Sequence, residues 1–313
     1  MLIYILKKLF SFLILLFILT LISVSIVYFS PNSPISHLSF YQSYYDFYYQ
    51  LFSYQSFALP LFQKNVYEIL HQILLPSFEL GLLAIICATL IGFPIGIISG
   101  LSDNSKFSHF LRLISWILYA SPLIWIAILI IWVASIDWHF VQHTDYTKTI
   151  SNSSLLDIFS ATNSNKLAML VDHFKPLFLP ALILTIQPCI ITIQIVSERV
   201  NLIANKNYIK VASIRENSSL KVLFRHLLPN AIPEIIPQLT YNITTLLFSI
   251  MVIEILLNRA GVGTWLLSGF YKQDYSIIAL TLLCCGIIIS LLTLLSEILV
   301  VLIYSPQSRT IYE

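Results

Sequence analysis

Charged residues are scarce in this chain: they make up 10% of its 313 residues, whereas hydrophobic residues make up 58%. A soluble globular protein of this composition would have too few polar side chains to cover its surface, so we expect the lipid bilayer to be its solvent. The formal net charge of +2 gives no indication of a nucleic-acid partner. Composition therefore predicts an integral membrane protein.

The chain also lacks the residue patterns of several enzyme and metal-site classes. No glycine is followed by lysine, so the usual phosphate loop for binding and hydrolysing ATP is absent. There is neither a His-Glu-x-x-His pair nor a Gly-x-Ser-x-Gly motif. The four cysteines all lie inside apolar runs, which argues against a disulfide framework and a cysteine-type zinc site. They are Cys87, Cys189, Cys284 and Cys285. We expect no enzymatic activity from this chain and no cofactor bound to it.

Long apolar runs, in contrast, are abundant. A bilayer crossing needs about 20 apolar residues. Runs of about that length lie at residues 9–29, 79–100, 111–136, 177–198, 236–258 and 277–304. No small-x-small cleavage site precedes the Ser-Pro break at residues 30–34, so we expect the first run to be a retained helix and not a secretory signal. The predicted fold is all-α, integral to the membrane, with six transmembrane helices.

The distribution of positive charge predicts the orientation of these helices. An even number of crossings places both termini on one side, and most lysines and arginines fall on that same side. Because positive residues favour the cytoplasm, both termini and the basic loop at 199–235 are predicted to be cytoplasmic. We expect a multi-pass membrane protein.

The chain divides into four predicted parts. Residues 1–30 form a transmembrane helix, 31–72 a periplasmic segment, 73–304 a five-helix transmembrane domain and 305–313 a cytoplasmic tail. The periplasmic segment carries an aromatic-rich stretch at 40–54. This stretch is either a helix at the membrane interface, where tyrosines are common, or a cap over a substrate path.

The loop at 199–235 combines basic residues with an apolar face. The spacing i, i+3, i+4, i+7 of its large apolar residues predicts an amphipathic helix. These residues are Leu220, Leu223, Phe224 and Leu227. Pro229, Pro233 and Pro237 recur every four residues and predict a bend before the chain re-enters the lipid. A basic helix lying on anionic lipid is the alternative interpretation.

Polar residues at membrane depth need partners or water. They serve either as hydrogen bonds between helices or as the lining of an aqueous path. The candidates for the path are Gln187, Gln194, Asn242 and Glu254. A different class of function, an intramembrane metalloenzyme, would use Asp137, His139, His143 and Asp145, whose spacing could seat a metal.

A family resemblance becomes specific at residues 207–218 and 224–231. These residues resemble the EAA-type coupling loop of ABC-importer permeases of the dipeptide and oligopeptide branch. Further matches to the family follow in order along the chain, at residues 28–34, 75–80, 92–96, 121–125, 179–180, 254, 261–263, 273–275 and 305–309. Within that branch, the chain is most similar to the B permeases of Sap peptide-uptake systems.

The resemblance implies a type I ABC importer permease fold, a location in a bacterial inner membrane and a set of partners. They are a paralogous permease in a heterodimer, two cytoplasmic ATPase subunits that bind the ATP, and a periplasmic solute-binding protein. It implies peptides as cargo, cationic antimicrobial peptides among them, with a contribution to resistance. Polyamine (putrescine) export and haem or nickel-chelate transport stay open as alternatives.

The resemblance also implies which residues contact the ATPase. These are Tyr208, Ala212, Arg215, Glu216, Asn217, Ser218, Lys221, Phe224 and Arg225. The family's loop glycine falls at Glu216, where a positive φ would be unfavourable, so we expect the bend to move to Asn217. A second departure is Ala260, where relatives usually have proline.

Overall fold

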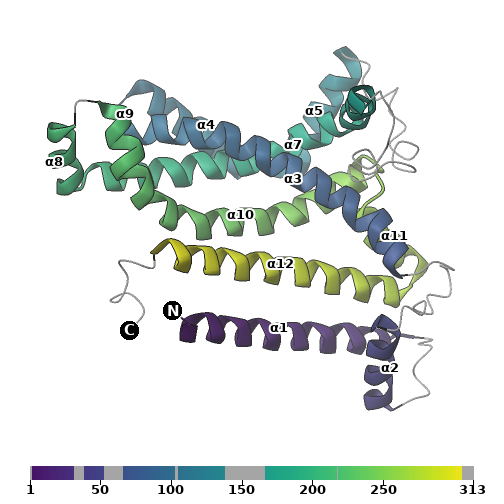
Figure 1. The fold of residues 1–313 in the computed structure, drawn as a ribbon. Helices are drawn as coiled ribbons and strands as arrows, with labels where there is room; N and C mark the ends of the chain where they lie inside the picture. Colours follow the sequence, from purple (N-terminus) through teal and green to yellow (C-terminus); the bar gives the residue numbers. More distant parts are fainter. Residues whose placement is uncertain are drawn as a thin grey trace.

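The structure is a computed structural model that describes residues 2–31, 39–52, 66–102, 105–137, 166–216 and 218–304. All secondary structure in these residues is helical (Figure 1). The helices are α1 (Leu2–Tyr28), α2 (Phe40–Phe52), α3 (Val66–Leu101), α4 (Lys106–Ala120), α5 (Leu123–Asp137), α7 (Lys166–Ala204), α8 (Asn207–Arg215), α9 (Ser219–Val222), the π-helix η1 (Leu223–Leu227), α10 (Leu228–Leu256), α11 (Val262–Lys272) and α12 (Tyr275–Tyr304).

Five of the described helical segments are long and apolar enough to cross a membrane. They are Tyr4–Tyr28, Ile73–Leu101, His173–Ala204, Ser219–Leu256 and Tyr275–Leu302. The helix pair α4 and α5 passes the same test together, which makes six crossings if the pair counts as one. The all-helical membrane fold predicted from the sequence is thereby confirmed.

The third predicted span, 111–136, is broken and not continuous. The segments Ser108–Ala120 and Leu123–Ile136 meet at an angle of 100°. Ser121 has extended backbone angles of φ −80° and ψ 129°. The cause is Pro122, because a proline ring disfavours the helical conformation of the preceding residue and supplies no backbone N–H.

Only the first of the three prolines that were predicted to bend the chain lies near a turn. Pro229 lies in the first turn of α10, where a missing N–H costs nothing. Pro233 and Pro237 lie inside α10, which continues as a helix to Leu256. Figure 1 shows the chain turning between α9 and α10, at the π-helix.

The main core lies where α3, α7 and α10 pack together. Three glycines of α3, four residues apart, allow a close approach to α7. A Cβ on Gly96 would lie 2.7 Å from Cβ of Val196, and one on Gly100 would lie 2.6 Å from the carbonyl oxygen of Ser197. The motif at 92–96 therefore serves the packing of two transmembrane helices.

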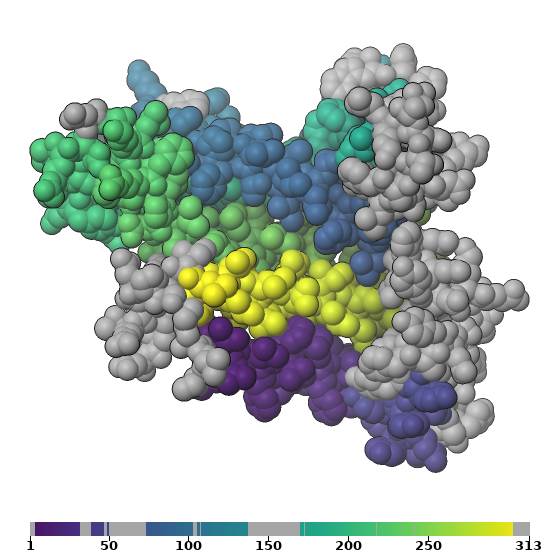
Figure 2. Space-filling view, viewed as in Figure 1, coloured from purple at the N-terminus to yellow at the C-terminus, as the bar shows by residue number. Residues whose placement is uncertain are grey.

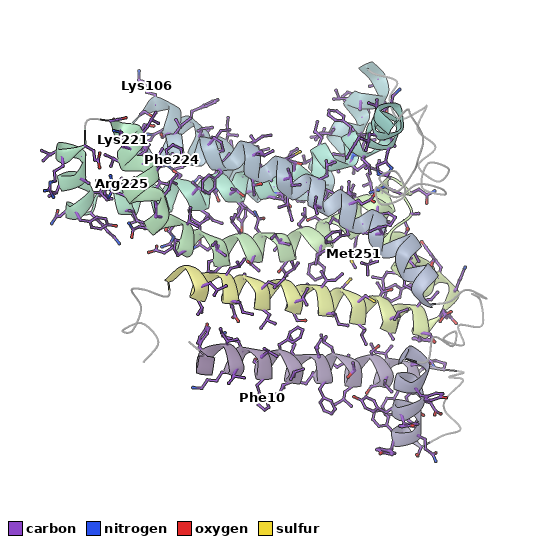
Figure 3. All side chains as sticks on the ribbon, viewed as in Figure 1. Phe10, Lys106, Lys221, Phe224, Arg225 and Met251 are labelled. Carbon is purple, nitrogen blue, oxygen red and sulfur yellow. The ribbon has the colours of Figure 1, made fainter. Side chains whose placement is uncertain are left out.

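A second layer is formed by α1 and α12, which contact each other along their lengths. Ser23 donates a hydrogen bond to the carbonyl oxygen of Ala279 at 3.0 Å, and Lys8 Nζ lies 2.7 Å from Glu297 Oε1. Phe10 on the other side of α1 is 67% exposed and points away from the bundle (Figure 3). That side of α1 is therefore available to lipid.

The described part of the aromatic stretch is the helix α2, which packs against α1. The hydroxyl groups of Tyr44 and Thr20 are 3.2 Å apart. Tyr41, Tyr45 and Tyr49 of α2 are exposed. Both interpretations of this stretch, as an interfacial helix or as a cap, stay open.

The two ends of the bundle differ in what they carry (Figure 1). The start of α1, the end of α12 and the helices α8 and α9 lie at one end, which we call the inner end. The helices α2 and α11 lie at the other, the outer end. Figure 2 shows the surface of α8 and α9 projecting beyond the adjacent ends of α1 and α12.

Candidate functional site

The segment from α8 to η1 is firmly packed onto the transmembrane bundle. Ile209, Val222 and Leu227 are buried, and they belong to a cluster with residues of α7 and α10. The members from α7 are Val196, Val200 and Ile203, and those from α10 are Ala231 and Ile235. A displacement of the segment would therefore be transmitted to both α7 and α10.

The opposite side of this segment exposes large apolar side chains, which we call the inner apolar surface. These are Tyr208 (47% exposed), Val211 (55%), Ile214 (84%), Leu220 (65%) and Phe224 (66%). The basic residues Arg215, Lys221 and Arg225 are exposed on the same segment, and Figure 3 shows Lys221, Phe224 and Arg225 at the inner end. Exposed apolar residues bordered by charge are typical of a protein-binding surface.

The amphipathic helix predicted for this segment is interrupted. Leu220 and Phe224 are exposed, whereas Leu227 is 2% exposed, so the four apolar residues do not share one environment. The reason is the π-helix η1, in which hydrogen bonds run from i to i+5 and shift the face that each residue presents. The assumption of regular 3.6-residue spacing was wrong here.

Glu216 occupies the position of the family's loop glycine without backbone strain. Its backbone is extended, with φ −94° and ψ 133°, and its N–H donates to the carbonyl oxygen of Ala212. The Glu216 carboxylate lies 3.5 Å from Arg225 Nη1 and 3.5 Å from His226 Nε2. Positive φ is therefore not required at Glu216. The bend predicted at Asn217 lies outside the described residues.

The remaining predicted contact residues of the loop are also placed. Tyr208 is exposed, while Ala212 and Ser218 are half-buried. Arg225, predicted to reach a partner, has the internal partner Glu216, but its side chain stays 74% exposed. An exposed pair of this length contributes little to stability and leaves Arg225 available to a binding partner.

At the outer end, Glu254 joins three helices. Its side chain is fully buried, and it accepts hydrogen bonds from Ser77 Oγ at 2.5 Å and from the backbone N–H of Gly263 at 2.8 Å. Ser77 Oγ in turn accepts from the backbone N–H of Val262 at 2.9 Å. Glu254 of α10 and Ser77 of α3 together satisfy the first N–H groups of α11, where negative charge is favourable.

The Gly261-Val-Gly263 turn is shaped by this network. A Cβ on Gly261 would lie 2.1 Å from Glu254 Oε1, and a Cβ on Gly263 would lie 2.2 Å from the carbonyl oxygen of Met251. Arg259 is buried and donates from Nη2 to the carbonyl oxygen of Pro76 at 3.4 Å. Ala260, the second departure from the family pattern, is exposed and takes no part in these contacts.

The other predicted path residues fall into two groups. Asn242 is 4% exposed, and its Nδ2 donates to the carbonyl oxygen of Pro188 at 3.0 Å, so it links α10 to α7 as Glu254 links α10 to α3. Gln187 and Gln194 are half-buried on α7. Gln194 lines a cavity of about 370 Å³ between α3, α4 and α7.

The side chains of the metalloenzyme alternative fall outside the part of the chain that the structure describes. His139, His143 and Asp145 lie outside the described residues, as does the side chain of Asp137. Within the described ranges, no group of three or more His, Cys, Asp or Glu residues could hold a metal ion.

Comparison with known proteins decides the family. Residues 92–305, more than half of the chain, match the family of binding-protein-dependent transport system inner membrane components. The chain belongs to this family. As a member, it is a multi-pass inner-membrane component of an ABC transport system, and the resemblance found in the basic loop is confirmed.

Individual relatives agree with this family. The chain is 25% identical to the "Peptide transport system permease protein SapB" of Escherichia coli O157:H7, over 96% of this chain and 95% of the relative. It has the same identity and coverage with the "Putrescine export system permease protein SapB" of Escherichia coli strain K12. The fold is similar to that of the MetNI methionine ABC transporter in inward-facing conformations, with a TM-score of 0.51 and 16% identity, over 72% of this chain and 92% of the other.

Sequence reasoning missed four residues in these sites. Ser77 was not recognised, because its contact with Glu254 joins residues far apart in the chain. Ser197, Glu198 and Asn201 of α7 were not recognised either. Together with the predicted Gln194 they have the helical spacing i, i+3, i+4, i+7, and that signal could have predicted the cavity.

Proposed function

We propose that this chain is one permease subunit of an ATP-driven peptide importer. Its partners would be a paralogous permease, two cytoplasmic ATPase subunits and a periplasmic solute-binding protein. The observation that carries the proposal is the inner apolar surface, which is exposed on a segment packed against both α7 and α10. The peptide cargo is supported by the name of the SapB relative from Escherichia coli O157:H7.

In this proposal, the segment from α8 to η1 transmits force from the ATPase to the membrane helices. The ATPase binds Tyr208, Leu220 and Phe224, whose exposed side chains lose water on binding. Arg215 and Lys221 border these residues and pair with acidic side chains of the ATPase. When the ATPase subunits move, the buried side of the segment moves α7 and α10 with it.

The proposed orientation places the inner end in the cytoplasm. It is supported by the basic residues of the loop, since positive residues favour the cytoplasmic side. The start of α1 and the end of α12 lie at the same end as this loop (Figure 1). Both termini and the inner apolar surface would then face the ATPase subunits, and α2 and α11 would face the periplasm.

The experiment is charge reversal on the assembled transporter. The triple variant Arg215→Glu, Lys221→Glu, Arg225→Glu is expected to abolish co-purification of the ATPase subunits and peptide uptake, while the protein still inserts into the membrane. Lys106→Glu is the matched control, because Lys106 is an exposed lysine at the inner end that lies on α4 (Figure 3). Normal uptake and normal ATPase association by the triple variant would contradict the proposal.

A second cargo has support from a specific relative. The SapB relative of strain K12 is named for putrescine export. Vesicles that contain the complete transporter should therefore be assayed for uptake of labelled peptide and for efflux of labelled putrescine in parallel. Transport of putrescine without transport of peptide would replace the first proposal with the second.

A further inference from the structure

A cavity lined by both polar and apolar side chains lies near the inner end of the bundle, between α3, α4 and α7. Its volume is about 370 Å³. This is within the range of pockets that hold small ligands, which starts at about 300 Å³. Ser99 and Asn201, which line it, are close to the inner ends of α3 and α7 at Leu101 and Ala204. The cavity is therefore at the level where a transported molecule would leave toward the cytoplasm.

The wall formed by α7 carries four polar residues beside the apolar Ile193. Gln194, Ser197, Glu198 and Asn201 are spaced i, i+3, i+4, i+7 and so lie on one face of the helix. Gln194, Ser197 and Glu198 lie in the predicted span 177–198, and Asn201 lies one turn beyond it on the same helix. Polar residues in such a segment are costly unless they face water, a ligand or other polar groups. One hydrogen bond between helices would need only one of these residues, so four on one face indicate a further role.

The opposite wall comes from α3 and α4 and is held in place by hydrogen bonds. Ser108 at the start of α4 donates to the carbonyl oxygens of Ser99 at 3.1 Å and Ser102 at 2.7 Å. Ser197 donates to Ser99 Oγ at 3.2 Å across the α3–α7 contact. Arg112 and Ser115 of α4 line the cavity beside them. The cavity is therefore formed before a ligand arrives.

The chemistry of the cavity matches a short peptide with both terminal charges. Glu198 provides a negative charge and Arg112 a positive one, and the side-chain amides of Gln194 and Asn201 can both donate to and accept from a peptide bond. No ion pair or hydrogen bond involves Glu198 or Gln194 within the described part of the chain. Both side chains are thus free to bind a ligand.

We propose that this cavity is a binding subsite for short zwitterionic peptides on the inner part of the transport path. Glu198 binds the terminal ammonium group, Arg112 the terminal carboxylate, and Gln194 a backbone amide. The inference rests on the proposed function, and it adds Arg112, Glu198 and Asn201 to the residues of the path. A phospholipid headgroup also carries two charges, but it offers no peptide bond to the amides of Gln194 and Asn201.

The test is protection of a thiol placed in the cavity. Leu111, an apolar lining residue, is changed to cysteine in a transporter whose four native cysteines are changed to alanine. The complete transporter is placed in nanodiscs, and the rate of labelling by a small thiol reagent is measured with and without trialanine. At a trialanine concentration about ten times its dissociation constant, labelling should slow about tenfold, because only the unoccupied fraction reacts.

Two variants and two matched controls connect the protection to the proposed contacts. Glu198→Gln and Gln194→Leu should abolish the protection. Glu297→Gln on α12 and Gln238→Leu on α10 make the same chemical changes at residues that do not line the cavity, and should retain it. N-acetyl-trialanine amide, which lacks both charges, and putrescine, which lacks the carboxylate and the amides, should not protect.

The outcomes separate this inference from the proposed function. If the ATPase subunits co-purify and peptide uptake is normal but trialanine gives no protection, the subsite is refuted and the proposed function stands. Equal protection by the uncharged peptide also refutes it. Labelling that responds to phosphatidylethanolamine in the nanodisc and not to trialanine would identify a lipid site instead.

Discussion

The change Gly261→Ala tests how tightly the outer turn is packed against the buried carboxylate of Glu254. The added Cβ would lie 2.1 Å from Oε1, 2.2 Å from Cδ and 2.5 Å from Oε2 of Glu254. All three distances are far shorter than a van der Waals contact of about 3.5 Å. Glu254 is fully buried, so its carboxylate can move only by leaving its two donors, Ser77 Oγ and the N–H of Gly263.

The expected cost follows from these two hydrogen bonds. A hydrogen bond to a charged group contributes about 1.5–3 kcal/mol, so the loss of both lowers the free energy of unfolding by about 3–6 kcal/mol. At about 2–4 °C per kcal/mol, even the lower value lowers the melting temperature by about 6–12 °C. The measurement is thermal unfolding of the purified transporter in detergent.

Two further variants make this prediction specific. Gly81→Ala is the matched control, because its Cβ would meet only Cδ1 of Ile250, the end of a flexible side chain, at 2.7 Å. It should change the melting temperature little. Combining Gly261→Ala with Glu254→Ala removes the clashing carboxylate, so the double variant should lose less stability than the sum of the single variants. A melting temperature of Gly261→Ala equal to that of the unchanged protein would refute the reasoning.

Two other contacts between transmembrane helices give predictions of different size. Gly96→Leu should prevent accumulation of folded transporter, because even a Cβ would lie 2.7 Å from Cβ of Val196. Expression of a fluorescent fusion analysed by size-exclusion chromatography measures this, and a normal monodisperse peak would contradict it. Asn242→Leu removes the hydrogen bond to the carbonyl oxygen of Pro188 and should cost only about 0.6–1.7 kcal/mol, since such bonds contribute modestly in membranes. A loss above about 3 kcal/mol in an unfolding titration would show that Asn242 does more than link α10 to α7.

Much of the architecture can be predicted from the sequence, because the ability of a segment to cross a bilayer depends mainly on the residues of that segment. Each long apolar run must satisfy its backbone polar groups internally, so it forms a helix whatever its neighbours are. The break at Ser121 also follows from one residue, Pro122, although the apolar run around it concealed the break. The family resemblance was recognised from adjacent residues of the basic loop, and the family match at 92–305 confirms that resemblance.

The environment of individual side chains depended on tertiary structure. The exposure of Phe224 and the burial of Leu227 follow from a π-helix that an apolar pattern of regular helical spacing does not reveal. Glu254 meets Ser77 only because α3 and α10 pack at the outer end. Glu198 and Arg112 line one cavity only because α4 is fixed against α3 and α7. Hydropathy places a residue in the membrane, but packing between segments distant in the chain decides which polar groups meet.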